Sequence, residues 1–172
     1  MTEPNRIDII TLPPDDWQVF RRIRLESLLD SPQAYTSTYT GMVDRPESFW
    51  RGRLEDARQA EQSWMLFARA GGEVVGMTGA FRDAENPALA TVVSVYVTPS
   101  ARGRGTAAML MTAILAALKE KGVQTARLNV TLGQDAALRL YQRHGFQIVK
   151  TESAVMGDGK FHDEYLMEKK IE

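Results

Sequence analysis

A glycine-rich turn between a strand-like segment and a helix-like segment is the feature that most constrains the fold of this chain. Residues 90–97 form an apolar, β-branched run that Pro99 ends, and residues 103–121 carry apolar residues at helical spacing up to Gly122. The turn between them reads Arg102-Gly103-Arg104-Gly105-Thr106-Ala107. A strand that leads through a short turn into a helix is typical of domains that mix the two kinds of element.

The rest of the chain also alternates between strand and helix patterns. Strands are expected at residues 6–12, 64–69, 73–81, 126–132, 146–155 and 161–168. Helices are expected at residues 17–29, from Pro46 onward and at residues 134–144. No internal repeat, low-complexity tract or break in composition marks a second domain. We therefore expect residues 1–172 to form one mixed α/β domain.

Charge and composition exclude several classes of protein. The chain has 21 Lys and Arg against 22 Asp and Glu, so it has no general attraction to nucleic acid or to an anionic membrane. The absence of cysteine excludes disulfides, thiolate metal ligands and a cysteinyl acyl-enzyme. No apolar run approaches the roughly 20 residues that span a bilayer, and the N-terminus lacks a signal pattern, so we expect a cytoplasmic protein. His144 and His162 form no metal-binding pattern, so no metal is expected.

The glycine-rich turn has the properties of a site for a phosphate-bearing ligand. Amide N–H groups at the start of a helix are unpaired and together carry about half a positive charge. Gly103 and Gly105 let a phosphate approach the backbone without meeting a Cβ atom. Arg102 and Arg104 can add charge-assisted hydrogen bonds. The expected ligand therefore carries phosphate, and pyrophosphate is the best match.

Two other interpretations of the turn stay open at this point. An isolated Gly-x-Gly can be an ordinary turn with two solvated arginines. The spacing of Gly103, Gly105 and Ala108 also matches the dinucleotide fingerprint, with Asp135 at a tolerable distance for a ribose carboxylate. That fingerprint normally begins a βαβ unit in a mostly parallel sheet, whereas here three strands with a short hairpin link precede the turn. The topology therefore favours a different cofactor.

Two sequence motifs follow one another at a characteristic distance. The first runs from Val95 to Ala107 and contains Arg102-x-x-Gly105-x-Ala107. The second is Leu128-x-Val130 followed by Ala137-x-x-Leu140-Tyr141-x-x-x-Gly145-Phe146. Together they resemble the signatures of the GNAT superfamily of N-acetyltransferases, and the resemblance covers residues 64–170. It implies an α/β (α+β) GNAT-like fold, with a central, mostly antiparallel mixed sheet that is splayed at the cofactor strand and flanked by helices.

The resemblance also implies acetyl-CoA as the co-substrate and a set of residues that bind it. The strand before the turn would offer the main-chain groups of Val95 and Val97 to the pantetheine arm. The amides of the turn would hold the pyrophosphate, as the helix-start argument also indicates. These residues are Arg102, Gly103, Arg104, Gly105, Thr106 and Ala107. Gln134 stands where the family frequently has an asparagine that contacts the cofactor, and glutamine keeps the amide but lengthens the reach.

Tyr141 is the catalytic residue that the resemblance implies. The tyrosine at this position of the family commonly lies near the thioester sulfur of the cofactor. With an ordinary pKa of about 10, it stays protonated at neutral pH and can give a proton to the departing thiolate. The alternative is a tyrosine that simply packs on the buried face of a helix. Arg139 and Arg143, on the same helix, either meet the adenosine phosphates or face solvent.

The general base and the acceptor pocket are less well defined. Many members of the family have a glutamate on the strand before the turn, but residues 91–97 contain no carboxylate. Carboxylates elsewhere are Glu26, Asp83, Glu85 and Asp163, and a chain of waters is the alternative. The helical excursion that usually shapes the acceptor pocket contains Tyr35, Tyr39, Met42, Phe49 and Trp50. If Tyr35 and Tyr39 face the pocket, the acceptor has an apolar or aromatic part; core packing is the other interpretation.

We expect an enzyme that transfers an acetyl group from acetyl-CoA directly to an amine on a small molecule, an amino acid or a protein N-terminus. Direct transfer is expected because the chain lacks both cysteine and a Gly-x-Ser-x-Gly elbow. Two alternatives stay open. One is a GNAT-fold protein that binds acyl-CoA and regulates a partner without turnover, and the other is an NAD(P)-dependent oxidoreductase. Dimerisation is common in the family, so a homodimer is an expectation from the resemblance alone.

Overall fold

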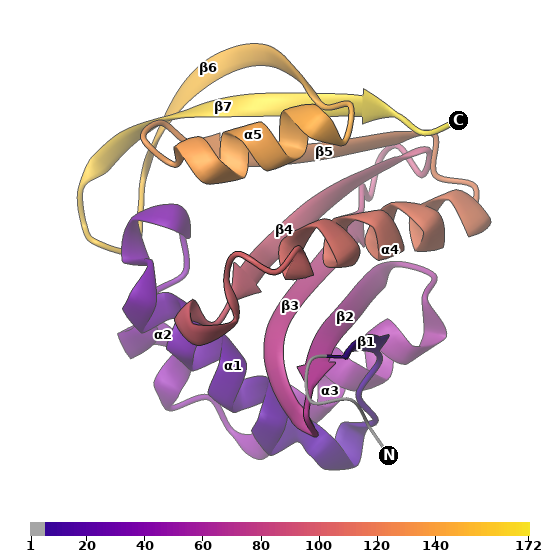
Figure 1. The fold of residues 1–172 in the computed structure, drawn as a ribbon, viewed down its shortest axis with the longest axis vertical. Coiled ribbons are helices and arrows are strands. Elements are labelled where there is room, and N and C mark those ends of the chain that lie inside the picture. Colours follow the sequence, from indigo (N-terminus) through magenta and orange to yellow (C-terminus); the bar gives the residue numbers. More distant parts are fainter. Residues whose placement is uncertain (1–5) are drawn as a thin grey trace.

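A seven-stranded sheet forms the centre of the structure, a computed structural model that describes residues 6–172 (Figure 1). The strands are β1 (Ile7–Ile10), β2 (Ser63–Ala70), β3 (Glu73–Arg82), β4 (Leu89–Val97), β5 (Thr125–Thr131), β6 (Gln147–Val155) and β7 (Phe161–Lys170). Their order across the sheet is β1-β2-β3-β4-β5-β7-β6. Neighbouring strands are antiparallel except for β4 and β5, which run parallel. The expected mixed, mostly antiparallel sheet is confirmed.

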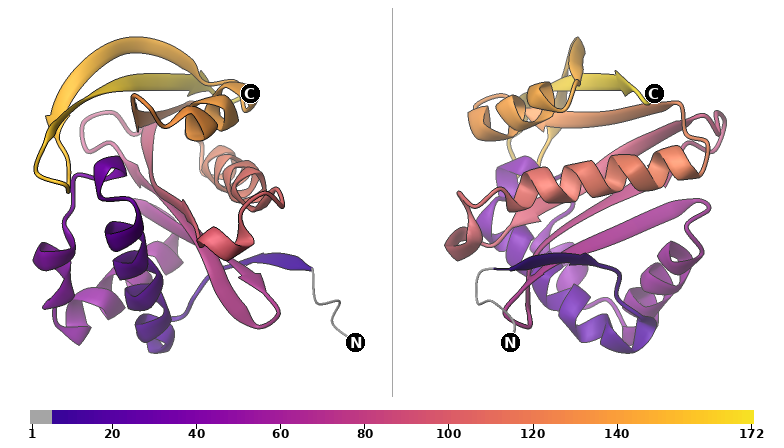
Figure 2. Two further views of the ribbon diagram at one scale, coloured as in Figure 1. Left: turned by 60° about the vertical axis from the view of Figure 1, so that its left-hand side comes forward. Right: turned by 45° about the vertical axis from the view of Figure 1, so that its right-hand side comes forward.

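Helices cover both faces of this sheet (Figure 2). One face carries α1 (Trp17–Asp30), α2 (Tyr39–Val43) and α3 (Glu47–Gln59), and the other carries α4 (Thr106–Glu120) and α5 (Asp135–Arg143). Apolar side chains of α1 and α3 pack with β2 and β3 in one core cluster. Those of α4 and α5 pack with β4 and β5 in a second cluster. Both faces of the sheet therefore contribute to the core.

β4 and β5 pair over only a short length. Their register joins Leu89 with Thr125, Ala90 with Ala126 and Thr91 with Arg127. Within residues 6–172, no pair joins these two strands beyond Thr91. Figure 1 shows β4 leaving β5 as it runs toward the turn before α4. The sheet is thus splayed at the strand where the resemblance expects the cofactor.

A β-bulge bends β4 where the two strands part. The register with β3 shifts there, so that Ser94 and Val95 lie opposite Thr78. Ser94 has a φ of 58°, in the left-handed region that few residues other than glycine adopt. Thr78 Oγ1 donates to Val93 O across the bulge at 3.3 Å. Because a bulge increases the local twist of a strand, it re-aims the end of β4.

Most of the expected elements are present with small shifts at their ends. The helix expected from residue 103 begins at Thr106, because Gly103 and Gly105 each have a φ of 79° that a helix cannot include. The first strand, expected at residues 6–12, ends at Ile10. No sequence pattern predicts α2, a five-residue helix that the Thr38 side chain caps.

The turn between β6 and β7 rests on the loop between α1 and α2. Gly157 N–H donates to Tyr35 O at 2.6 Å. A Cβ atom at Gly157 would lie 2.8 Å from Ser37 O and 2.9 Å from Pro32 O. These are backbone atoms, which cannot swing aside as a flexible side chain can, so the approach requires glycine. The contact joins two segments that are far apart in the sequence.

This packing makes a prediction about Gly157. The substitution Gly157→Ala is expected to lower the free energy of unfolding by about 1–3 kcal/mol, the usual cost of overpacking. Gly52→Ala is the control, because Gly52 lies inside α3 and a Cβ atom there meets nothing within 4 Å. Since alanine favours a helix over glycine by about 1 kcal/mol, the control should be neutral or stabilising. Urea unfolding measures both; two equally stable variants would contradict the close approach.

Candidate active site

A cavity of about 1240 Å³ opens where β4 and β5 part. The turn after β4, the start of α4 and the length of α5 form one end of it. Residues of α1, the α1–α2 loop, α3 and β3 form the other end. The cavity therefore reaches both faces of the sheet, and ligands could enter from two sides.

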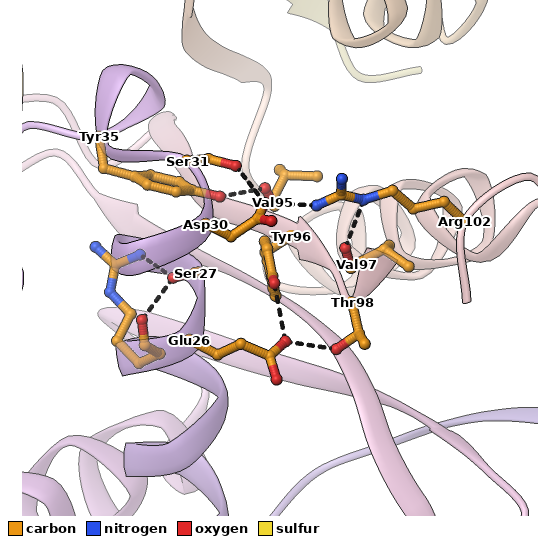
Figure 3. Close-up of polar contacts among 11 residues, drawn as sticks. Glu26, Ser27, Asp30, Ser31, Tyr35, Val95, Tyr96, Val97, Thr98 and Arg102 are labelled. Carbon is orange, nitrogen blue, oxygen red and sulfur yellow. Dashed lines mark hydrogen bonds and ion pairs between the residues drawn. The ribbon is translucent and has the colours of Figure 1, made fainter. Parts of the chain in front are cut away.

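The main chain of β4 faces this cavity at Val95 and Val97. Thr98 N–H donates across to β3 at 2.7 Å. Because backbone groups alternate in direction along a strand, those of Val97 and Val95 point the other way, into the gap beside β5. Tyr35 OH donates to Val95 O at 2.9 Å, and Arg102 Nε donates to Val97 O at 2.9 Å (Figure 3). The two carbonyl groups are engaged, which leaves the N–H groups for a ligand.

The turn before α4 presents a row of main-chain N–H groups to the cavity. A Cβ atom at Gly103 or Gly105 would meet nothing within 4 Å, so the space beside the turn is open. No side chain caps α4, and its first main-chain bond ends on Gly105 O at 3.0 Å. Within residues 6–172, the N–H groups of residues 103–108 therefore have no acceptor, whereas Arg102 N–H donates to Pro99 O at 3.3 Å. This arrangement suits a phosphate group.

The two arginines of the turn have different surroundings. Arg102 Nη2 donates to Asp30 Oδ2 at 2.7 Å, and its guanidinium lies 5.7 Å from the centre of the Tyr96 ring. Hydrogen bonds from Ser31 and from Arg102 hold the pKa of Asp30 below its ordinary value. The Arg102 side chain thus ties the turn to α1. Arg104 lies exposed on the turn, outside the cavity wall.

Tyr141 lies in the cavity wall near the end of α5. Its side chain is buried, and its ring meets the Phe146 ring edge to face with centres 6.2 Å apart. Burial raises the pKa of the Tyr141 hydroxyl, and the nearby Tyr35 adds to the rise. Burial also raises the pKa of Tyr35 to about 12. Both hydroxyls therefore carry their protons at neutral pH, as a proton donor must.

The other expected cofactor contacts lie on or beside α5. Gln134 precedes α5 and lines the cavity, and its side chain makes no cap for the helix. Arg143 also lines the cavity, whereas Arg139 does not. The structure thus brings Gln134, Tyr141 and Arg143 to one wall and leaves Arg139 outside it.

None of the four carboxylates suggested as a general base lines the cavity. Glu26 Oε2 accepts from the Tyr96 hydroxyl at 2.8 Å and from the Thr98 hydroxyl at 2.6 Å (Figure 3). Glu26 therefore fastens α1 to the end of β4. Two of the others lie in the β3–β4 loop and one on β7; they are Asp83, Glu85 and Asp163. Their positions do not support the base role.

Glu164 is the one acidic residue among residues 6–172 that lines the cavity. It lies on β7 opposite Thr131 of β5 and is 7% exposed. Asn129 Nδ2 donates to Glu164 Oε1 at 2.7 Å. Thr131 Oγ1 donates to Gln33 O at 3.0 Å, so this face of β5 and β7 looks toward the α1–α2 loop. No motif marks Glu164, and its place in the cavity depends on the pairing of β7 with β5, so sequence reasoning missed it.

The residues expected in the acceptor pocket divide between the cavity and the core. Tyr35, Met42 and Phe49 line the cavity. Trp50 is fully buried in the core cluster of α1 and α3, and Tyr39 packs beside that cluster outside the cavity. Core packing, the other interpretation from the sequence, is therefore correct for Trp50, and Tyr39 does not line the cavity. Their apolar spacing on the helices is explained by core packing.

Three arginines line the acceptor end of the cavity, and sequence reasoning missed all three. They are Arg24 on α1, Arg45 in the loop before α3, and Arg53 on α3. Arginine is common on solvated helix faces, so a sequence pattern does not separate a cavity-facing arginine from an exposed one.

Neither a metal site nor a membrane span appears among residues 6–172. No group of three or more His, Asp or Glu side chains there is placed to hold a metal ion. No helix in this range combines the length and apolar character needed to cross a membrane. His144 Nδ1 lies 2.9 Å from Leu140 O, and His162 Nε2 lies 2.7 Å from Asp158 Oδ2, so the two histidines have separate partners.

Comparison with known proteins connects this site to one family. Residues 25–146 match the model of the acetyltransferase (GNAT) family. The mycothiol acetyltransferase of Paenarthrobacter aurescens is 34% identical over 131 residues, which are 70% of this chain and 40% of that protein. The mycothiol acetyltransferase of Mycobacteroides abscessus is 34% identical over 48% of this chain and 28% of its own length. The chain thus spans less than half the length of these curated relatives.

Solved structures share the whole architecture. An acetyltransferase of the GNAT family from Streptococcus pneumoniae matches with a TM-score of 0.85 and 20% identity, over 97% of this chain and 100% of that chain. A phosphinothricin acetyltransferase from Sinorhizobium meliloti, in complex with acetyl-CoA, matches with a TM-score of 0.80 and 18% identity, over 96% of this chain and 88% of that chain. The fold expected from the resemblance is confirmed, and the dinucleotide-binding alternative is wrong. The chain belongs to the acetyltransferase (GNAT) family.

Proposed function

We propose that residues 1–172 form one domain that transfers the acetyl group of acetyl-CoA directly to an amine. The observation that carries this proposal is that three features meet at one cavity: the unpaired amides of the turn, the unpaired edge of β4 and Tyr141. Amides at the start of a helix bind pyrophosphate, and an unpaired strand edge can pair with an extended arm such as pantetheine. A buried phenol can assist a leaving group.

The two ends of the cavity suit the two substrates. At the end formed by α4 and α5, the amides of residues 103–108 would hold the pyrophosphate, with Gln134 and Arg143 beside them. The N–H groups of Val95 and Val97 would hold the pantetheine arm. The amine would enter from the side of α1, α2 and α3. When bound, acetyl-CoA supplies a thioester carbonyl that an unprotonated amine can attack.

Tyr141 is proposed to assist the departure of sulfur. Attack by the unprotonated amine nitrogen forms a C–N bond and breaks the C–S bond. The nitrogen gives its remaining extra proton to solvent, and negative charge develops on sulfur. Because burial raises the pKa of Tyr141 further above the value of about 8.5 for a thiol, full proton transfer to a free thiolate is unfavourable. Tyr141 would therefore act mainly by donating a hydrogen bond to sulfur as the charge develops.

Glu164 is proposed as the group that takes a proton from the acceptor. An ammonium with a pKa of about 10.4 is not a nucleophile, so the amine must lose a proton before it attacks. Glu164 lines the cavity, and the hydrogen bond from Asn129 fixes the orientation of its carboxylate. Transfer can occur directly or through one water molecule.

The acceptors of the curated relatives are not part of this proposal, because the chain spans only 40% and 28% of those mycothiol acetyltransferases. The cytoplasmic location and the homodimer stay predictions.

The proposed activity is tested by a screen of amines with acetyl-CoA, read by release of free thiol. Thermal unfolding with CoA, NAD and NADP tests binding separately. Stabilisation by CoA without thiol release from any amine would favour a regulator, and stabilisation by NAD alone would overturn the proposal.

Gly105→Val is expected to weaken CoA binding by at least about tenfold, because a β-branched side chain strains a positive φ and obstructs the phosphate. Gly122→Val is a matched control, since Gly122 has the same φ of 79° and the same open surroundings at the other end of α4. Calorimetric titration with CoA measures both variants. If both lose affinity equally, or neither does, the turn is not the phosphate site.

Tyr141→Phe is expected to lower kcat by about 10²-fold with little change in CoA affinity, because it removes a bond made mainly in the transition state. Tyr39→Phe is the control, since Tyr39 lies outside the cavity. Steady-state kinetics at saturating acceptor and calorimetric titration separate the two effects. Full activity of Tyr141→Phe, with fast product release demonstrated, would end the assignment.

Glu164→Gln is expected to lower kcat/KM by about 10²-fold at neutral pH, the usual contribution of a general base. The loss should shrink as pH rises toward about 10, because a larger fraction of the amine is then unprotonated. Asp163→Asn is the control, since Asp163 neighbours Glu164 on β7 outside the cavity and accepts from Ser153 Oγ at 2.6 Å. A loss that is the same at every pH would show a structural role for Glu164.

A further inference from the structure

Arg24 is a buried cation in the cavity wall with no carboxylate partner in the described chain. It lies on α1 and is 9% exposed. Its guanidinium makes one hydrogen bond within residues 6–172, to Ser27 Oγ at 3.4 Å, and lies 4.9 Å from the centre of the Tyr35 ring. None of the ion pairs formed among residues 6–172 includes Arg24.

A guanidinium in this position costs folding free energy. A buried charge loses its hydration and is normally compensated by an opposite charge or by several hydrogen bonds. Burial is the main cause that lowers the pKa of Arg24; Tyr35 partly opposes this, and Arg53 lowers it further. Guanidinium nevertheless keeps its charge at neutral pH, and it has five N–H donors. Most of the donors of Arg24 are therefore available to a ligand in the cavity.

Two more arginines face the same end of the cavity. The guanidinium of Arg53 lies 4.9 Å from the Phe81 ring and 5.8 Å from the Phe49 ring, and that of Arg45 lies 4.7 Å from the Phe49 ring. Neither takes part in an ion pair among residues 6–172. A guanidinium held against an aromatic ring keeps its N–H edge available, and that edge matches an oxyanion with two bonds.

Arg24 lies one aromatic ring away from the part of β4 where the pantetheine arm would bind. The ring of Tyr35 separates Arg24 from β4, since Tyr35 OH donates to Val95 O at 2.9 Å. The wall on the side of β5 and β7 carries the carboxylate of Glu164. Apolar side chains also line the cavity, and they include Met42, Met65, Met77, Phe49 and Phe81. The cavity therefore has a cationic wall of arginines, an anionic carboxylate and an apolar surface.

We propose that the acceptor is an amine that also carries an anionic group, a carboxylate or a phosphorus oxyanion, and that Arg24 and Arg53 bind this group. The inference rests on the proposed acetyltransferase activity and specifies its substrate class. An acceptor of the α-amino acid type with an apolar side chain matches the three features of the cavity. Its anion meets the arginines, its amine lies toward Glu164, and its side chain packs on the methionines and phenylalanines.

The first test compares matched amines with the wild-type protein. Each apolar amino acid is assayed beside its aminophosphonate, its carboxamide and the amine that lacks the carboxylate. The anionic members are expected to have a kcat/KM about 10²-fold higher than their neutral partners, the effect of a charge-assisted bidentate contact. The carboxylate and phosphonate arms identify which oxyanion fits. Equal use of neutral and anionic amines would overturn the proposal.

The second test removes the cations. Arg24→Met and Arg53→Met should each lower kcat/KM for anionic acceptors by about tenfold or more, and this loss should exceed any change in the low rate with neutral amines. Arg51→Met is the control on α3, since Arg51 lies outside the cavity and pairs with Asp15 and Glu47, each at 2.7 Å. Arg24→Met should keep or raise the melting temperature, because it removes an unpaired buried charge. A lower melting temperature with unchanged acceptor preference would show that Arg24 is structural.

Failure of the activity and failure of the anion site can be told apart. If wild-type protein acetylates no amine, thermal unfolding with the amino acids and their N-acetyl derivatives still measures anion binding. Stabilisation of wild type and of Arg51→Met, but not of Arg53→Met, would support the site. If Arg24→Met does not fold, Arg53→Met carries the comparison. No stabilisation of wild type by any of these anions would overturn the proposal.

Discussion

The site depends on the early end of the pairing between β4 and β5. Three residue pairs hold the parallel strands together, and the bulge at Ser94 then directs β4 away from its neighbour. Continued parallel pairing of β4 with β5 would have used the backbone groups of Val95 and Val97 for strand pairing. Because the strands part, those groups face a cavity, and the turn amides, α5 and the α1–α2 loop can all reach it.

Side chains around this opening replace the missing strand contacts. Tyr35 bonds to Val95 O, Arg102 bonds to Val97 O, and Glu26 accepts from the hydroxyls of Tyr96 and Thr98 (Figure 3). These bonds fasten the free end of β4 to α1 and to the turn. The bonds from Tyr35 and Arg102 also satisfy carbonyl groups that would otherwise be unpaired at the cavity wall, where a lost hydrogen bond costs about 1–3 kcal/mol. The opening is therefore held in shape without a neighbouring strand.

The sequence predicted those features of the structure that depend on a few consecutive residues, and it did not predict those that depend on tertiary packing. The turn, α4 and the position of Tyr141 on α5 were predicted, because glycine conformation and helical spacing are properties of a few consecutive residues. The sequence did not predict which carboxylate lines the cavity, because Glu26 looks the same in sequence whether it faces a cavity or connects two elements. Trp50 and Phe49 are adjacent in the sequence, yet one is in the core and the other lines the cavity.

The sequence by itself determined the glycine-rich turn, most of the order of strands and helices, and the resemblance to the GNAT superfamily. Only the tertiary structure decided which charged groups meet in the cavity. Glu164 reaches it through the register of β7 on β5, and Arg24 and Arg53 come together from two helices that pack on the same face of the sheet. The physical reason is that backbone conformation is encoded over a few neighbouring residues, whereas burial of a charge depends on every element packed around it.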